Sequence, residues 1–121
     1  MFHRVQQYEL IAMDGRWFRP RVYGDRQPDG SWDGWLVFFP LDGGPAIASD
    51  RETVQRTFDA LGLWATGLTR TYLDGALARA IMLAEQPAAI AELPIAEYEA
   101  LDDAERREDL VAEGAEAEKA R

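Results

Sequence analysis

The sequence predicts a small α+β domain in which an antiparallel sheet comes first and helices follow. Asp-Gly pairs at 14–15, 29–30, 33–34 and 42–43 separate apolar segments in the first part of the chain. Asp-Gly favours tight hairpin turns, so the segments between these pairs are expected to form a β-meander. From residue 49 onward the apolar residues recur at helical spacing. The chain has 121 residues, enough for one hydrophobic core and too few for two domains of ordinary size.

The most apolar segment, 32–40, is the expected centre of the sheet. Its bulky apolar residues occupy both parities, and it ends at Pro40, as in a strand that is buried on both faces. The predicted meander has three to four strands, at about residues 3–13, 16–23, 32–40 and 45–48. Pro20 has no backbone N–H, so the second strand is expected at an edge of the sheet or with a bulge.

Two to four helices are expected to pack on one face of this sheet, at about residues 50–65, 70–85 and 87–101. Ser49 and Glu52 have the spacing of a capping box, which predicts the start of the first helix. A helical apolar stripe follows, formed by Val54, Phe58, Leu61 and Ala65. Thr71 and Asp74 form a looser capping pattern at the start of the second helix.

Acidic residues are concentrated at the end of the chain. The net charge is −9, and residues 85–121 hold 12 Asp/Glu against four Arg/Lys. We therefore expect one α+β domain over 1–101 and an acidic, partly helical or disordered tail over 102–121. Such tails are most often solubilising, but this one has three other interpretations: mimicry of nucleic-acid phosphate, binding of a basic partner, or contact with the chain's own Arg19 and Arg21.

Composition excludes several classes of site. The chain has no Cys and one His, His3, which argues against disulfides, thiolate metal sites, cysteine nucleophiles and a Ser-His-Asp triad. Asp25, Asp29 and Asp33 lie four apart, but Asp29 and Asp33 each precede Gly and are better explained as turn residues, so no metal or other cofactor is predicted. No apolar run reaches the roughly 18 residues of a membrane helix, and the N-terminus lacks an apolar signal core, so no membrane partner and a cytoplasmic location are expected. One Lys against twelve Arg, with nineteen Ala, suggests a bacterial genome rich in G and C.

The second predicted strand holds the first candidate binding site. Trp17, Arg19, Arg21 and Tyr23 share one parity. If the other parity faces the core, these side chains form an outer row that can stack on bases and pair with phosphates, or bind an acidic peptide. The alternative is a structural role, in which Trp17 and Tyr23 pack on neighbouring strands and the arginine stems cover them.

A second candidate site is a cleft between sheet and helices. Asp33, Arg70, Tyr72 and Asp74 are the residues to inspect there, because carboxylates, Tyr and Arg can perform acid–base chemistry without His.

Several stretches resemble a family of small uncharacterised bacterial proteins. They are Asp29 to Phe38 with its Trp-Gly pattern, Arg51 to Gln55, the connector Ala60 to Leu68 containing Trp-Ala-Thr-Gly-Leu, and Tyr72 to Ala80. The resemblance covers roughly residues 8–82 and excludes the acidic tail. It supports the domain boundary and implies no activity, ligand or catalytic residue.

The absence of catalytic patterns and the many aromatics favour a non-enzymatic interaction or accessory module. Its partner is expected to be another protein or a second copy, with a homodimer as one possibility. A basic footprint for duplex nucleic acid is missing, so a nucleic-acid partner is disfavoured. The alternative is a small ligand-binding protein or enzyme that uses the cleft residues. A nucleic-acid-related inhibitor that acts through acidic mimicry is a weaker alternative.

Overall fold

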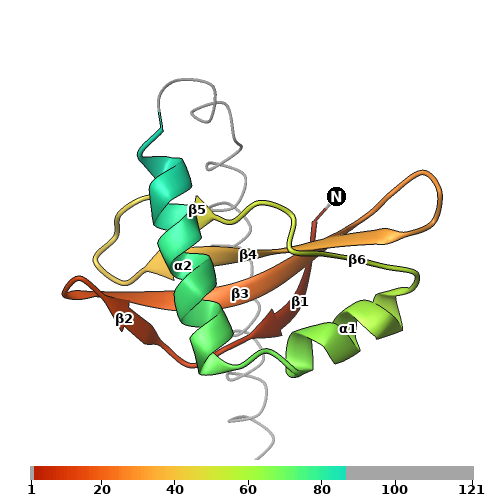
Figure 1. Cartoon of the computed structure of the whole chain (residues 1–121), viewed down its shortest axis with the longest axis horizontal. Coiled ribbons are helices and arrows are strands. Elements are labelled where there is room, and N and C mark those ends of the chain that lie inside the picture. Colours follow the sequence, from red (N-terminus) through yellow and green to blue (C-terminus); the bar gives the residue numbers. More distant parts are fainter. Residues whose placement is uncertain (1, 87–121) are drawn as a thin grey trace, which may run out of the picture.

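A six-stranded antiparallel sheet with two helices forms the described structure. The computed structural model describes residues 2–86. Its elements, in chain order, are β1 (His3–Gln7), β2 (Ile11–Met13), β3 (Arg16–Arg26), β4 (Trp32–Pro40), β5 (Ile47–Ala48), β6 (Thr53–Gln55), α1 (Phe58–Thr66) and α2 (Arg70–Ala84). The long hairpin β3–β4 is the centre of the sheet (Figure 1). β1 and β2 pair with the edge of β3 that faces away from β4. β5 and β6 pair with the edge of β4 that faces away from β3. The α+β class and the antiparallel sheet predicted from the sequence are confirmed.

The hairpin β3–β4 matches the prediction closely. β4 spans the predicted residues, and every residue from Gly34 to Pro40 is buried. β3 continues to Arg26, three residues beyond the predicted end, because it pairs with β4 continuously from Phe18↔Pro40 to Arg26↔Trp32. The two-sided apolar pattern of β4 therefore corresponds to a strand in the middle of the sheet.

Pro20 was expected at an edge of the sheet or with a bulge, and the edge placement was wrong. β3 lies between β4 and the pair β1 and β2. The Pro20 carbonyl accepts a hydrogen bond from the Tyr8 N–H at 3.0 Å, so the backbone of Pro20 faces the side of β1 and β2. The missing N–H therefore lies opposite the break between Gln7 and Ile11, where the ladder is already interrupted.

The break divides the predicted first strand, 3–13, into β1 and β2. Its middle residue Tyr8 connects the sheet to α1, because the Tyr8 hydroxyl donates a hydrogen bond to the Ala65 carbonyl at 2.6 Å. Burial raises the pKa of the Tyr8 phenol above its ordinary value.

The segment after residue 49 differs most from the prediction. Residues 53–55 form β6, and α1 begins only at Phe58, with Thr57 as its N-cap. Ser49 belongs to the sheet instead, since its hydroxyl accepts from the Leu36 N–H at 3.1 Å and donates to the Asp50 carbonyl at 2.8 Å. The Glu52 N–H donates to the Gly34 carbonyl at 2.8 Å. Pairing with β4 therefore takes precedence over the local helical pattern in this segment.

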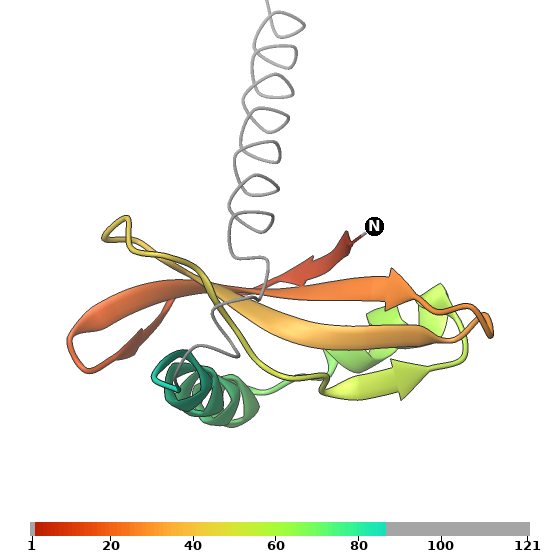
Figure 2. The same cartoon turned by 90° about the horizontal axis from the view of Figure 1, so that it is seen from above.

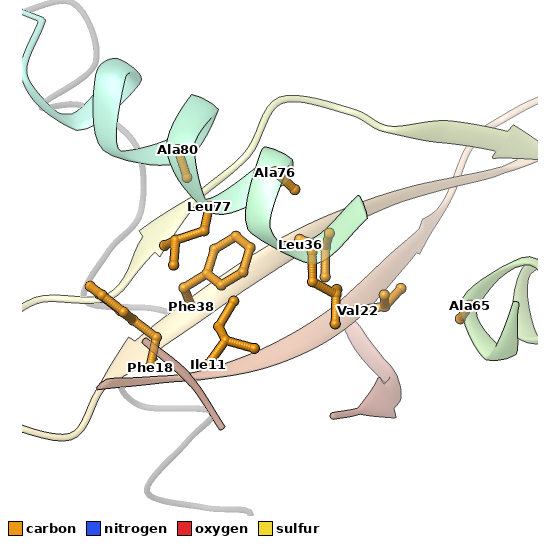
Figure 3. Close-up of a cluster of buried hydrophobic side chains, with 10 residues drawn as sticks. Ile11, Phe18, Val22, Leu36, Phe38, Ala65, Ala76, Leu77 and Ala80 are labelled. Atoms are coloured by element: carbon orange, nitrogen blue, oxygen red, sulfur yellow. The ribbon is translucent and has the colours of Figure 1, made fainter. Parts of the chain in front are cut away.

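Helix α2 confirms the predicted helix over 70–85. Its N-cap is Thr69, whose hydroxyl accepts from the Tyr72 N–H at 3.2 Å, and not the predicted Thr71. The helix runs across the strands (Figure 1) and buries a core with the sheet. In Figure 3, Ala76, Leu77 and Ala80 of α2 lie over Phe18, Leu36 and Phe38.

Helix α1 packs on the same face of the sheet at a pair of glycines. Gly24 and Gly34 are opposite each other in β3 and β4, and the fully buried Leu61 of α1 lies over both. A Cβ atom on Gly24 would lie 2.5 Å from Leu61 Cδ2, and a Cβ atom on Gly34 would lie 2.6 Å from Leu61 Cδ1. Only glycine permits this close approach of the helix to the sheet.

The opposite face of the sheet holds a second buried cluster, formed by Tyr23, Trp35, Val37, Phe39 and Ala46. The predicted helix over 87–101, the domain boundary at residue 101 and the tail over 102–121 lie outside the described residues. Within residues 2–86, no helix is long and apolar enough to cross a membrane.

Candidate functional site

The four side chains predicted to form a row on the second strand do share one face of the sheet. Only part of this row is accessible. Trp17, Arg19, Arg21 and Tyr23 alternate with Phe18, Pro20 and Val22 along β3, so they lie on the face opposite the helices. Trp17 is 54% exposed and Arg19 is partly buried. Arg21 and Tyr23 are buried, at 1% and 0% exposure. Only the first two therefore reach the surface.

Arg21 and Tyr23 pack within the sheet face. The Arg21 Nε donates to Gln7 Oε1 at 2.7 Å, and the guanidinium carbon lies 4.8 Å from the centre of the Phe39 ring. The rings of Tyr23 and Phe39 are 6.4 Å apart. These contacts match the structural interpretation of the row for these two residues.

At the other end of the row, an exposed apolar pair lies beside Arg19. The Leu41 N–H donates to the Trp17 carbonyl at 2.9 Å, and the two side chains are 48% and 54% exposed. Arg19 is the next residue of β3 on this face and is paired with the buried Phe39. We call Trp17, Arg19 and Leu41 the Trp17 patch.

An ion pair joins the strand ends that carry the Trp17 patch. The Arg16 Nε donates to Asp42 Oδ2 at 2.8 Å, and the Gly44 N–H donates to Asp42 Oδ1 at 2.9 Å. The hydrogen bonds from Arg16 and then from Gly44 lower the pKa of the Asp42 carboxyl below its ordinary value. Asp42 therefore stays ionised, and it links the two strand ends that carry Trp17 and Leu41.

The four residues of the predicted cleft do not form one site. Asp33 faces away from the helices, with an Arg51 nitrogen 3.7 Å from its carboxylate. Arg70 and Asp74 form an ion pair of 3.1 Å within α2. The Tyr72 hydroxyl donates a hydrogen bond to Glu52 Oε1 at 2.8 Å. The four side chains therefore belong to three separate sets of contacts.

Of the residues predicted for the cleft, Tyr72 belongs to a different group, in which the Glu52 carboxylate accepts from two donors. Tyr72 and Arg79 both donate to Glu52 Oε1, and the Glu52 side chain is 8% exposed. Burial, followed by the hydrogen bond to Glu52 and its charge, raises the pKa of the Tyr72 phenol above its ordinary value. The neutral phenol is therefore a stable donor to Glu52.

Glu52 was not among the residues predicted for a site, because its spacing from Ser49 assigned it to a helix cap. One signal could have indicated this group. Tyr72 and Arg79 are seven residues apart, so they lie on one side of a helix, two turns from each other. A hydroxyl and a guanidinium on one side of α2 indicate an acidic acceptor on another element.

Glu52 also lines a cavity of about 230 Å³ at the end of α2. The described residues that line it are Asp50, Glu52, Arg79, Met82, Leu83 and Gln86. A second cavity, of about 220 Å³, is lined by Tyr8, Glu9, Ile11, Arg70 and Leu73. Both are smaller than the roughly 300–1,000 Å³ of most small-molecule sites.

Two further findings concern cofactors and relatives. Among residues 2–86, no group of three or more His, Cys, Asp or Glu side chains is placed to hold a metal ion. No protein-family model, curated protein or solved structure matches the sequence. The resemblance to small bacterial proteins therefore stays an expectation.

Proposed function

We propose that this protein is a non-enzymatic interaction module that binds another protein, or a second copy of itself, through the Trp17 patch. The supporting observation is the exposed pair Trp17 and Leu41, two large apolar residues joined by a backbone hydrogen bond, Trp17 on β3 and Leu41 directly after β4. Trp and Arg are the residue types that dominate the binding energy of protein interfaces. The patch offers both, since Arg19 lies next to the pair on the same face.

The form of the patch favours a protein over a single-stranded nucleic acid. A single-strand binding groove needs successive aromatic platforms along a basic track. Of the four residues proposed for such a track, Arg21 and Tyr23 are buried, which leaves one ring and one guanidinium accessible. One apolar anchor with a polar border is the typical centre of a protein interface.

Parallel affinity purification from the source organism tests the proposal. The bait is the full chain in three forms: wild type, the double variant Trp17→Ser/Leu41→Ser, and the control Leu63→Ser. Leu63 is the most exposed large apolar residue of the described chain and lies on α1, away from the patch. We expect a co-purifying protein, or the chain's own untagged copy, with wild type and control and a loss of at least about tenfold with the double variant. The same partners with all three baits would refute the proposal.

Sedimentation velocity of the three purified forms distinguishes the two kinds of partner. If the partner is a second copy, wild type and Leu63→Ser sediment as dimers at high concentration and the double variant as a monomer. If the partner is a different protein, all three forms sediment alike.

A further inference from the structure

The sheet face opposite the helices is buried although neither described helix lies on it. Arg21, Tyr23 and Val37 on this face are 0–1% exposed. Helix α2 lies on the other side of the sheet (Figure 2), and α1 packs through Leu61 on that same side. A sheet in a folded domain buries a face only against another layer.

The ring contacts on this face run along the sheet, and Phe2, Ala46 and Ala48 pack at its border. Phe2 meets Trp35 edge to face, with ring centres 5.0 Å apart. Arg21 and Tyr23 each meet the ring of Phe39. Val37 is nevertheless fully buried, and small residues at the border are a poor cover for a strand in the middle of the sheet, so its burial points to an occupant above the sheet.

The chemistry of the face indicates what this occupant is like. Trp35, Val37 and Phe39 form an apolar floor that requires apolar side chains. Arg21 lies within this floor and Arg19 beside it, and two positive charges at a poorly hydrated surface favour carboxylates. The buried Trp35 Nε1 has no hydrogen-bond partner among the described residues, so an oxygen atom from the occupant would satisfy it. The occupant is therefore apolar and acidic at once.

The chain itself contains a segment of this composition. Residues 87–121 follow directly after the last described residue, Gln86. Their first part is apolar, with Ile90, Leu93, Ile95, Tyr98 and Leu101, and acidic residues dominate the remainder.

The connection to α2 gives this segment an advantage over any separate molecule. A tether of a few residues creates an effective concentration on the order of millimolar. A second copy at micromolar concentration would have to bind about a thousandfold more tightly to compete.

We propose that the sheet face formed by Arg21, Tyr23, Trp35, Val37 and Phe39 is the docking surface for the chain's own acidic segment, residues 87–121. The segment supplies the layer that the described helices do not supply on this side. This inference does not depend on the Trp17 patch binding a partner. It adds that the patch lies at the margin of an occupied face, so that a partner meets Trp17 and Leu41 and not the buried row.

Nuclear Overhauser effects in the methyl-labelled full chain test this proposal, because Val37 and its neighbour Leu36 face opposite sides of the sheet. The Leu36 methyl groups are the internal control and should give cross-peaks to side chains of α2 such as Leu77. We expect the Val37 methyl groups to give cross-peaks to side chains within residues 87–121. A mixed sample of labelled and unlabelled chains, recorded with isotope filtering, identifies contacts between copies.

Two outcomes would overturn the proposal. Val37 cross-peaks confined to residues 2–86 would show that the segment does not cover the face. Cross-peaks found only between copies would assign the occupant to a second molecule. Because the protein is used unmodified, a failure to fold cannot produce either result.

Discussion

Replacing Gly34 by alanine is a strong test of how helix and sheet fit together. The new Cβ atom would lie 2.6 Å from Leu61 Cδ1 and 3.0 Å from Thr53 Cγ2. Leu61 cannot simply turn away, since it is fully buried and its other methyl group lies over Gly24. Overpacking of a core typically costs about 1–3 kcal/mol. With two atoms at 3.0 Å or less, the cost here should lie in the upper part of that range, about 2–3 kcal/mol. Alanine recovers about 0.5–1 kcal/mol by restricting the unfolded chain, so we expect a net loss of about 1–2.5 kcal/mol.

Urea unfolding followed by far-ultraviolet circular dichroism measures this change. Gly62→Ala is the matched control, because a Cβ atom at Gly62 meets nothing within 4 Å. This control lies within α1 and should be stabilised by about 0.5–1 kcal/mol. A Gly34→Ala variant as stable as wild type would refute the close approach of α1 to the sheet.

A double variant tests whether Leu61 is the cause. Leu61→Ala alone should cost about 2–5 kcal/mol through the cavity that it leaves. In Gly34→Ala/Leu61→Ala the new methyl group enters that cavity, so the combined cost should be at least about 1 kcal/mol below the sum of the two single costs. Additive costs would contradict the assignment of the clash to this pair.

Three further predictions follow from the hydrogen bonds of the described chain. Because burial raises the pKa of Tyr8, the unfolded chain loses the phenol proton first as the pH rises above about 10, and the unfolding free energy of wild type falls there. Tyr8→Phe should show a smaller fall between pH 9 and 11 in urea titrations, and an equal fall would contradict the assignment. Thr69→Ala should lower the unfolding free energy by about 1 kcal/mol, because Thr69 caps α2, whereas Thr71→Ala should change it by less than about 0.5 kcal/mol; the reverse order would mean that the cap is misplaced. Glu52→Gln removes a negative charge that raises the pKa of Tyr72, so the Tyr72 ring resonances should titrate at lower pH in this variant, and an unmoved titration would argue against the contact.

The elements with the clearest local patterns were predicted well. β4 and α2 were predicted almost to the residue, because an unbroken apolar strand between turn residues and a long helical stripe depend on nearby residues alone. The segment 50–57 was predicted poorly for the opposite reason. Its spacing fits a helix, but hydrogen bonds from Ser49 and Glu52 to β4 hold it at the edge of the sheet.

The candidate sites show the same division. Parity placed Trp17, Arg19, Arg21 and Tyr23 on one face, and the structure confirms that placement. Whether a side chain on that face is accessible depends on what packs above it, and alternation along a strand contains no such information. Arg21 and Tyr23 are therefore buried while Trp17, near the end of the hairpin, is exposed.

By itself, the sequence determined the class of the domain, its central strand and its second helix, because hydrophobic periodicity and turn chemistry act over a few residues. Only the tertiary structure decided that Pro20 lies inside the sheet, that Glu52 is the acceptor for Tyr72 and Arg79, and that the row on β3 is half buried. Each of these depends on contacts between residues far apart in the chain. Such contacts follow from which surfaces fit and cover one another, and that is settled only when the layers pack.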